Sequence, residues 1–173
     1  MKLSFKNDKI ILYLNNYYIS NLNINNKEEI NKYTQKILNK IGKKYYLHLN
    51  GYYNINMYFD NNFGIIMEII SQETPYLDYF NNDIDINIKV YKDSFLYEVN
   101  DINNEDYITY IYNNHIYVKS KKYFSQNFMM KFIEKVIDIK YGAEKDLILK
   151  SSKVLRWDYE KRNSCHCWQT QCW

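Results

Sequence analysis

The strict alternation of apolar and polar residues in two segments constrains this fold more than any other feature. Residues 84–90 alternate Ile and Val with Asp, Asn and Lys, and residues 52–59 alternate similarly. Successive side chains of a β-strand point to opposite faces, so this period of two predicts strands with one buried face. Shorter apolar runs extend the prediction. Strands are expected at residues 3–5, 10–14, 45–49, 52–59, 63–70, 83–91, 95–99, 107–112 and 116–118.

Turn residues separate these strands. Asn7-Asp8 is expected to close an opening hairpin, and Asn113-Asn114 is typical of a type I′ turn between two strands. Residues 64–67 are apolar on both faces, which places their strand centrally in the sheet. A meander is the most economical topology. Residues 17–19 are expected to form a short extension, and residues 72–82 a loop.

The clearest helix signal begins at Asn26. This residue is a natural N-cap, and Glu29 supplies the acidic partner of a capping box. Apolar residues then recur with the helical period as far as Ile41. Gly42 is expected to end the helix. The opposite face, with Lys32, Lys36, Asn39 and Lys40, is expected to be solvated.

Helical periodicity returns near the C-terminus. A second helix is expected from Ser125 through Ile139, ending before Gly142, and a shorter third one at residues 143–155. Helices on one face of an antiparallel sheet would bury its alternating apolar side chains. The prediction is therefore an α+β fold, a two-layer sandwich with a mostly antiparallel meander sheet, one helix after the first hairpin, and one or two C-terminal helices.

A change in composition divides the chain into residues 1–155, a single α+β domain, and a tail at residues 156–173. Every Cys, Trp and Arg lies in that tail. Three interpretations remain open: an appended segment outside the fold, a docking or maturation element, and a soft-metal or redox site. The metal candidates are Cys165, His166, Cys167 and Cys172, although they lack two separated C-x-x-C pairs.

The domain carries no recognisable catalytic set. It has no Cys, no Gly-rich phosphate loop and no hydrolase or metalloprotease motif, so no catalytic residue and no cofactor is assigned. His48 and His115 are expected to be cross-strand partners. Glu68 and Glu98 lie in apolar strands and need partners. A metal-dependent hydrolase or nuclease would need two carboxylates to converge, and the candidates are Glu68, Asp83, Asp85 and Glu98.

Tyrosine and lysine on the strands supply the candidate binding residues. The formal net charge of +3 is too small to indicate a nucleic-acid partner by itself. Exposed tyrosines favour protein recognition, so the leading hypothesis is a non-enzymatic interaction or regulatory protein whose partner is another protein. A single-stranded nucleic-acid-binding module is the first alternative. The candidate binding residues are Tyr52, Tyr58, Tyr91, Tyr97, Tyr110, Tyr112, Tyr117, Lys89 and Lys92.

No apolar run approaches the length of a membrane span, so no membrane partner is expected and the protein is interpreted as cytoplasmic. Residues 50–58 (NGYYNINMY), 63–69 (FGIIMEI) and 93–98 (DSFLYE) resemble segments of small uncharacterised proteins from A/T-rich low-GC bacteria. The resemblance covers about residues 1–150. It implies a bacterial cytoplasmic or mobile-element origin and carries no activity.

Overall fold

The structure is a computed structural model that describes residues 2–6, 9–19, 22–47, 49, 51–72, 84–100 and 106–155. The tail at residues 156–173, with its four metal candidates, lies outside the described residues, as do His48 and Asp83. The strands are β1 (Lys2–Lys6), β2 (Lys9–Asn15), β3 (Gly51–Asp60), β4 (Gly64–Gln72), β5 (Ile84–Lys92), β6 (Leu96–Val99), β7 (Tyr107–Tyr112), β8 (His115–Ser120), β9 (Val136–Lys140) and β10 (Lys153–Leu155). The helices are α1 (Asn16–Ile19), α2 (Lys27–Tyr45), α3 (Gln126–Ile133) and α4 (Gly142–Ser151).

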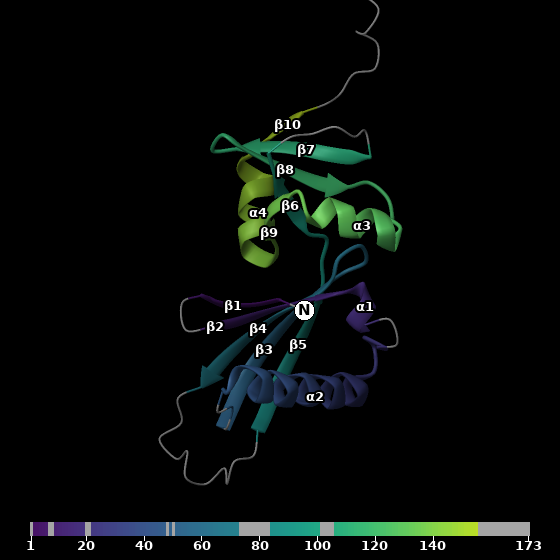
Figure 1. Cartoon of the computed structure of the whole chain (residues 1–173). Coiled ribbons are helices and arrows are strands. Elements are labelled where there is room, and N and C mark those ends of the chain that lie inside the picture. The colour runs from purple at the N-terminus through teal and green to yellow at the C-terminus, as the bar shows by residue number, and fades with distance from the viewer. Residues whose placement is uncertain are drawn as a thin grey trace, which may run out of the picture.

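The strands form two open sheets, and the predicted α+β sandwich is confirmed (Figure 1). The predicted single meander is wrong, because the strands divide into two sheets and β4 lies between β2 and β3. The first sheet has the order β1-β2-β4-β3-β5 and the second the order β10-β7-β8-β6-β9. All pairs are antiparallel except β3 and β5, which run parallel. The central place predicted for residues 63–70 is confirmed, because β4 lies between β2 and β3.

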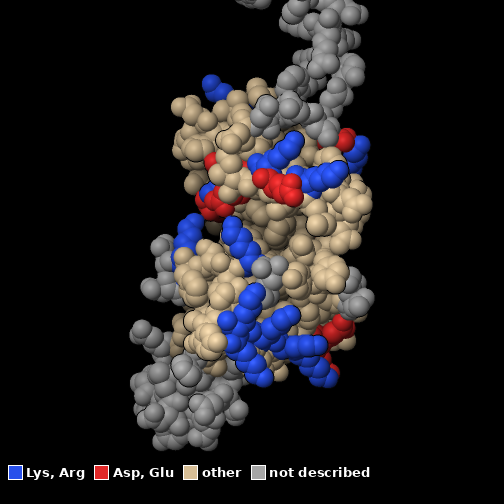
Figure 2. All heavy atoms as spheres, viewed as in Figure 1, with Lys and Arg blue, Asp and Glu red and all other residues tan. Residues whose placement is uncertain are grey.

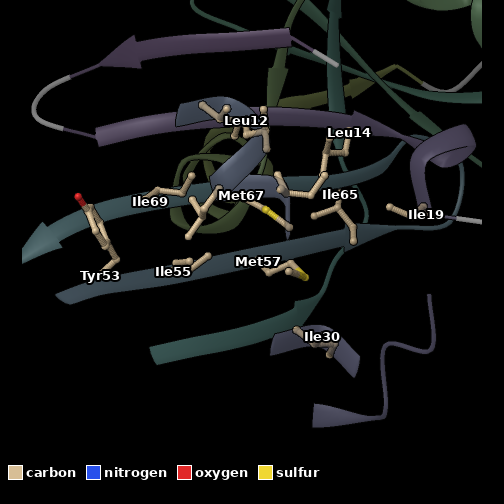
Figure 3. Close-up of a cluster of buried hydrophobic side chains, with 13 residues drawn as sticks. Leu12, Leu14, Ile19, Ile30, Tyr53, Ile55, Met57, Ile65, Met67 and Ile69 are labelled. Carbon is tan, nitrogen blue, oxygen red and sulfur yellow. The ribbon is translucent and has the colours of Figure 1, made fainter. Parts of the chain in front are cut away.

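Of the two alternating strands, β3 buries the side chains that its pattern predicts, whereas on β5 Ile86 and Ile88 are only partly buried and Val90 is 36% exposed. On β3, Tyr53, Ile55 and Met57 are buried, whereas the residues between them are partly exposed. These side chains pack with those of β2 and β4 under the apolar stripe of α2, which covers this face of the first sheet (Figure 3). The hydrophobic effect of this layer is the main reason that α2 lies on the sheet.

The opposite face of the first sheet packs against the second sheet and α3. Ile11, Phe63 and Ile66 of the first sheet form one apolar cluster with buried residues of the second half of the chain, including Phe95 and Phe132. The two sheets therefore share a core, with the first sheet buried on both sides over part of its area.

The predicted N-cap at Asn26 is confirmed, but the capping box and the predicted end of α2 are wrong. Glu29 accepts a hydrogen bond from the Asn23 N–H at 2.9 Å, and the Asn26 N–H donates to the Asn23 carbonyl at 3.0 Å. The Asn26 side chain accepts hydrogen bonds from the N–H groups of Glu28 and Glu29, at 3.1 and 3.3 Å. The helix continues past Gly42 to Tyr45, and Tyr46 ends it in a left-handed conformation with φ of 54°. The strand predicted at residues 45–49 is therefore wrong, because Tyr45 belongs to α2 and Tyr46 ends that helix.

Three further predictions are corrected. Residues 17–19 belong to α1, not to a strand extension. The helix predicted through Ile139 ends at Ile133, and residues 136–140 form β9, which pairs with β6. The last predicted helix ends at Ser151, and residues 153–155 pair with β7 as β10. β9 and β10 form through pairing with distant strands, which local periodicity does not contain.

Candidate functional site

The first sheet brings four of the predicted binding residues onto one face. Tyr52 and Tyr58 on β3 stand beside β5, where Tyr91 pairs with Tyr58 and Lys89 with Asn56. The Tyr58 and Tyr91 rings are stacked, with centroids 5.1 Å apart and 19° between their planes. This face is the one opposite α2, and Tyr91 and Lys89 are exposed on it.

Glu68 lies within the same face and finds the partners that its burial requires. Its carboxylate lies 3.9 Å from the Lys9 amine, accepts a hydrogen bond from Asn56 at 3.4 Å, and accepts another from the Tyr141 hydroxyl at 3.3 Å. Burial, with the neighbouring Glu68 charge as a second cause, raises the pKa of Tyr58 to about 12 and that of Tyr141 further. The cluster is a packed contact between the first sheet and the residue that precedes α4.

The other predicted binding residues do not join this face. Tyr97 is buried, and its hydroxyl donates to Asp60 at 3.3 Å; burial raises its pKa well above the ordinary value. Tyr117 is also buried, so neither ring is open to a partner. Tyr110 and Tyr112 are partly exposed on the second sheet, and Lys92 is exposed on the α2 side of β5.

The three candidate carboxylates that the structure describes, Glu68, Asp85 and Glu98, are not brought together. Glu68 pairs with Asn56, and Asp85 pairs with Tyr52, four residues away along β3. That separation corresponds to roughly 13 Å along the strand. Glu98 belongs to the second sheet. Among the described residues, no group of three or more His, Cys, Asp and Glu side chains could hold a metal ion.

Glu98 is paired with His115, as its place in an apolar strand requires. The Nδ1 atom of His115 lies 2.8 Å from Oε1 of Glu98, and Glu98 is buried, whereas His115 is exposed. The pair links β6 to the first residue of β8. A hydrogen-bonded partner for a buried carboxylate explains this contact without a catalytic role.

A groove of about 920 Å³ lies where α1 and the end of β2 face α3 and β9. Four apolar or aromatic side chains that line it are between 55% and 72% exposed, namely Tyr17, Tyr123, Met130 and Ile137. Lys2 and Asp138 are its only charged lining residues within the described part of the chain. We call this surface the apolar groove.

Two asparagines hold the walls of the apolar groove together. The Asn16 side-chain amide donates to the carbonyls of Asn61 and Asn62, at 3.0 and 2.8 Å. Asn62 in turn accepts from the Phe124 N–H at 2.7 Å and donates to the Lys122 carbonyl at 3.3 Å. These bonds connect α1, the β3–β4 turn and the segment before α3, so the groove is preformed.

Sequence reasoning did not select the groove residues, although signals for two of them exist. Met130 follows Met129 in an expected helix and falls outside its apolar stripe, as Ile137 does beside Val136. An apolar residue off the stripe of an amphipathic helix indicates an exposed contact. Tyr17 and Tyr123 carry no such signal in a chain with 20 tyrosines.

No helix among the described residues is both long and apolar enough to cross a membrane. Comparison of the chain with protein-family models, with curated proteins and with solved structures finds no match. The proposed function therefore rests on the surfaces of this chain.

Proposed function

We propose that this protein works by binding another protein, and that the apolar groove is the contact surface. The observation that carries the proposal is the set of four exposed side chains, Tyr17, Tyr123, Met130 and Ile137, around one preformed groove. Aromatic residues and Met are enriched, and charges depleted, at the centres of protein interfaces. The hypothesis of a protein partner, drawn from the sequence, is kept. The proposed contact surface is now the apolar groove and not the sheet face.

The composition of the groove favours a protein segment with bulky apolar side chains. Its floor is apolar, including Met129 and Ile133, while Asn15, Asn61 and Gln126 add side-chain amides. Thioether side chains adapt to different apolar surfaces, and amides on the rim can satisfy the polar groups of a partner backbone. Because hydrogen bonds already fix the walls, binding would lose little conformational entropy on this side.

The partner contacts the groove through side chains and not by adding a strand to β9. All four residues from Val136 to Ile139 line the groove. Because alternate side chains of a strand point to opposite faces of the sheet, β9 presents its edge to the groove. The Asp138 carboxylate accepts a hydrogen bond from the Ile139 N–H at 2.8 Å. A charged side chain on an edge strand discourages pairing with a further strand.

Site-specific photo-crosslinking tests the proposal. A photo-reactive phenylalanine derivative would replace Tyr123 or Met130 in the full chain, expressed in the native cell. The matched controls are Tyr46, which is 91% exposed after α2, and Tyr91 on the sheet face. We expect both groove positions to give an adduct with the same protein and Tyr46 to give none.

Three outcomes would overturn the proposal. An adduct from Tyr91 alone would assign the contact to the sheet face. Equal adducts from Tyr46 and the groove positions would show unspecific contact. A groove adduct with twice the mass of the chain would show that the groove binds a second copy, and not another protein.

A further inference from the structure

The exposed face of α2 carries a stripe of lysines with no acid among them. Lys32, Lys36, Lys40 and Lys43 recur at helical spacing, and Gln35 and Asn39 lie between them on the same surface. At 3.6 residues per turn, these four lysines fall within about 80° of one another around the helix axis. Figure 2 shows blue side chains gathered over the lower part of the molecule, where Figure 1 places α2. We call this surface the lysine stripe.

No carboxylate among the described residues neutralises the lysine stripe. The two acidic residues of α2, Glu28 and Glu29, lie in its first turn, ahead of the stripe. Within the described part of the chain, none of the four lysines forms an ion pair with a carboxylate. Yet the whole chain has a net charge of only +3. The stripe is therefore a local cluster of positive charge on a chain of small net charge.

We infer that the lysine stripe binds the phosphate backbone of a nucleic acid duplex, independently of the protein contact proposed for the groove. The four lysines span roughly 17 Å of helix at 1.5 Å per residue. Over that length, a DNA duplex presents about ten negative charges. The stripe therefore meets more phosphates than it has lysines, and Gln35 and Asn39 can donate to phosphate oxygens between them.

The chemistry of the face distinguishes a duplex from two other anionic partners. Every apolar residue of α2 that is buried, from Ile30 to Ile41, faces the first sheet, so the helix has no apolar face to insert into a membrane. No exposed aromatic ring on which single-stranded bases could stack lies between Lys32 and Lys43, because Tyr33 is only partly exposed and its hydroxyl bonds to the Tyr18 carbonyl, and the exposed Tyr46 lies beyond the last lysine. Backbone contact without base stacking suits a duplex.

Fluorescence anisotropy with a short labelled DNA duplex tests the inference. Four phosphate contacts predict that affinity falls about 150-fold between about 50 mM and 200 mM salt. In the double variant Lys36→Gln/Lys40→Gln, two contacts remain, and the same change of salt should cost about 12-fold. Gln keeps a similar helix propensity, so the fold should persist, which circular dichroism would verify.

The matched control is Lys150→Gln/Lys153→Gln, which removes one exposed lysine from α4 and another from β10. It should leave the affinity and its salt dependence unchanged. No binding at the lowest salt, or an equal loss in both double variants, would overturn the inference. Tighter binding to a single strand than to the duplex, or binding to phosphatidylserine vesicles without duplex binding, would also overturn it.

Discussion

The Asp93 carboxylate accepts a hydrogen bond from the Gly142 N–H, with 3.0 Å between Oδ2 and the nitrogen. Asp93 lies in the connection from β5 to β6, where the chain leaves the first sheet and enters the second. Gly142 begins α4. The other oxygen of Asp93 pairs with Lys145, and both of these charged side chains are largely buried. This contact fixes α4 to the segment that joins the two sheets.

Removing the Asp93 carboxylate should destabilise the protein strongly. Asp93→Ala leaves the buried Lys145 amine with only the exposed Asp146 carboxylate, 3.5 Å away, and the Gly142 N–H without an acceptor. The free energy of unfolding should fall by about 3 kcal/mol, measured by urea denaturation. Asp93→Asn keeps an acceptor oxygen and should cost less. If Asp93→Ala/Lys145→Met is no more stable than Asp93→Ala, the unpaired charge is not the cause.

The pair of Glu98 and His115 gives a second prediction. His115→Ala removes the partner of a buried carboxylate and should lower the free energy of unfolding by about 1–2 kcal/mol. The measurement is a double-mutant cycle, because Glu98→Gln removes the charge that needs the partner. His115→Ala should cost less in that background. An equal cost in both backgrounds would show that the histidine acts through packing alone.

The sequence predicted the elements whose signals are local. Alternation along residues 52–59 assigned the buried face of β3 correctly, and Asn26 capped α2 as expected. The hairpin at Asn113-Asn114 also forms, with φ of 49° and 63° at the two residues, as a type I′ turn requires. Each of these signals depends on neighbours in the chain, and so it can be read without tertiary contacts.

The remainder depends on contacts between distant segments. Residues 136–140 continue the helical period of α3, yet they pair with β6, because the edge of the second sheet offers backbone hydrogen bonds there. Alternation also assigns Tyr58 and Tyr97 to particular strand faces. It does not reveal that Tyr58 lies between the two sheets or that Tyr97 packs against α3. Residues from both halves of the chain line the apolar groove. It could therefore be found only once the positions of both sheets were known.

Gly64 offers a test of the close approach between β2 and β4. Its φ is +125°, and an added Cβ would lie 2.3 Å from the Leu14 carbonyl oxygen, a backbone atom. Gly64→Ala should therefore lower the free energy of unfolding by roughly 2–5 kcal/mol, from strain and steric overlap. Thermal and urea unfolding would measure this.

The matched control is Gly42→Ala in α2. An added Cβ at this position meets the Leu47 carbonyl oxygen at 3.1 Å, and Gly42 has no unusual backbone angle. Helix propensity favours Ala by up to about 1 kcal/mol, which offsets the tight contact, so the net change should stay within about 1 kcal/mol. Equal losses in both variants would contradict the special role assigned to Gly64.

The buried tyrosines predict that the fold loses stability in alkali. Burial raises the pKa of Tyr58 and Tyr107 to about 12, and that of Tyr97 well above its ordinary value near 10. Above about pH 10, the unfolded chain loses tyrosine protons that the folded chain keeps. The folded state then binds more protons, so its stability is full below pH 10 and falls as the pH rises towards 12.

Tyr97 isolates one contribution to this loss, because its ring is buried and its hydroxyl bonds to Asp60. Each tyrosine that titrates only in the unfolded chain adds a slope of about 1.4 kcal/mol per pH unit. Tyr97→Phe removes the hydrogen bond to Asp60, so it should lower the free energy of unfolding by a constant amount between pH 8 and 9. Above pH 10, the free energy of unfolding of this variant should fall less steeply with pH, by about 1.4 kcal/mol per pH unit. Urea midpoints across the range would measure both effects. An unchanged slope would show that the Tyr97 hydroxyl ionises as readily in the folded chain as in the unfolded one, and that its burial does not control the alkaline response.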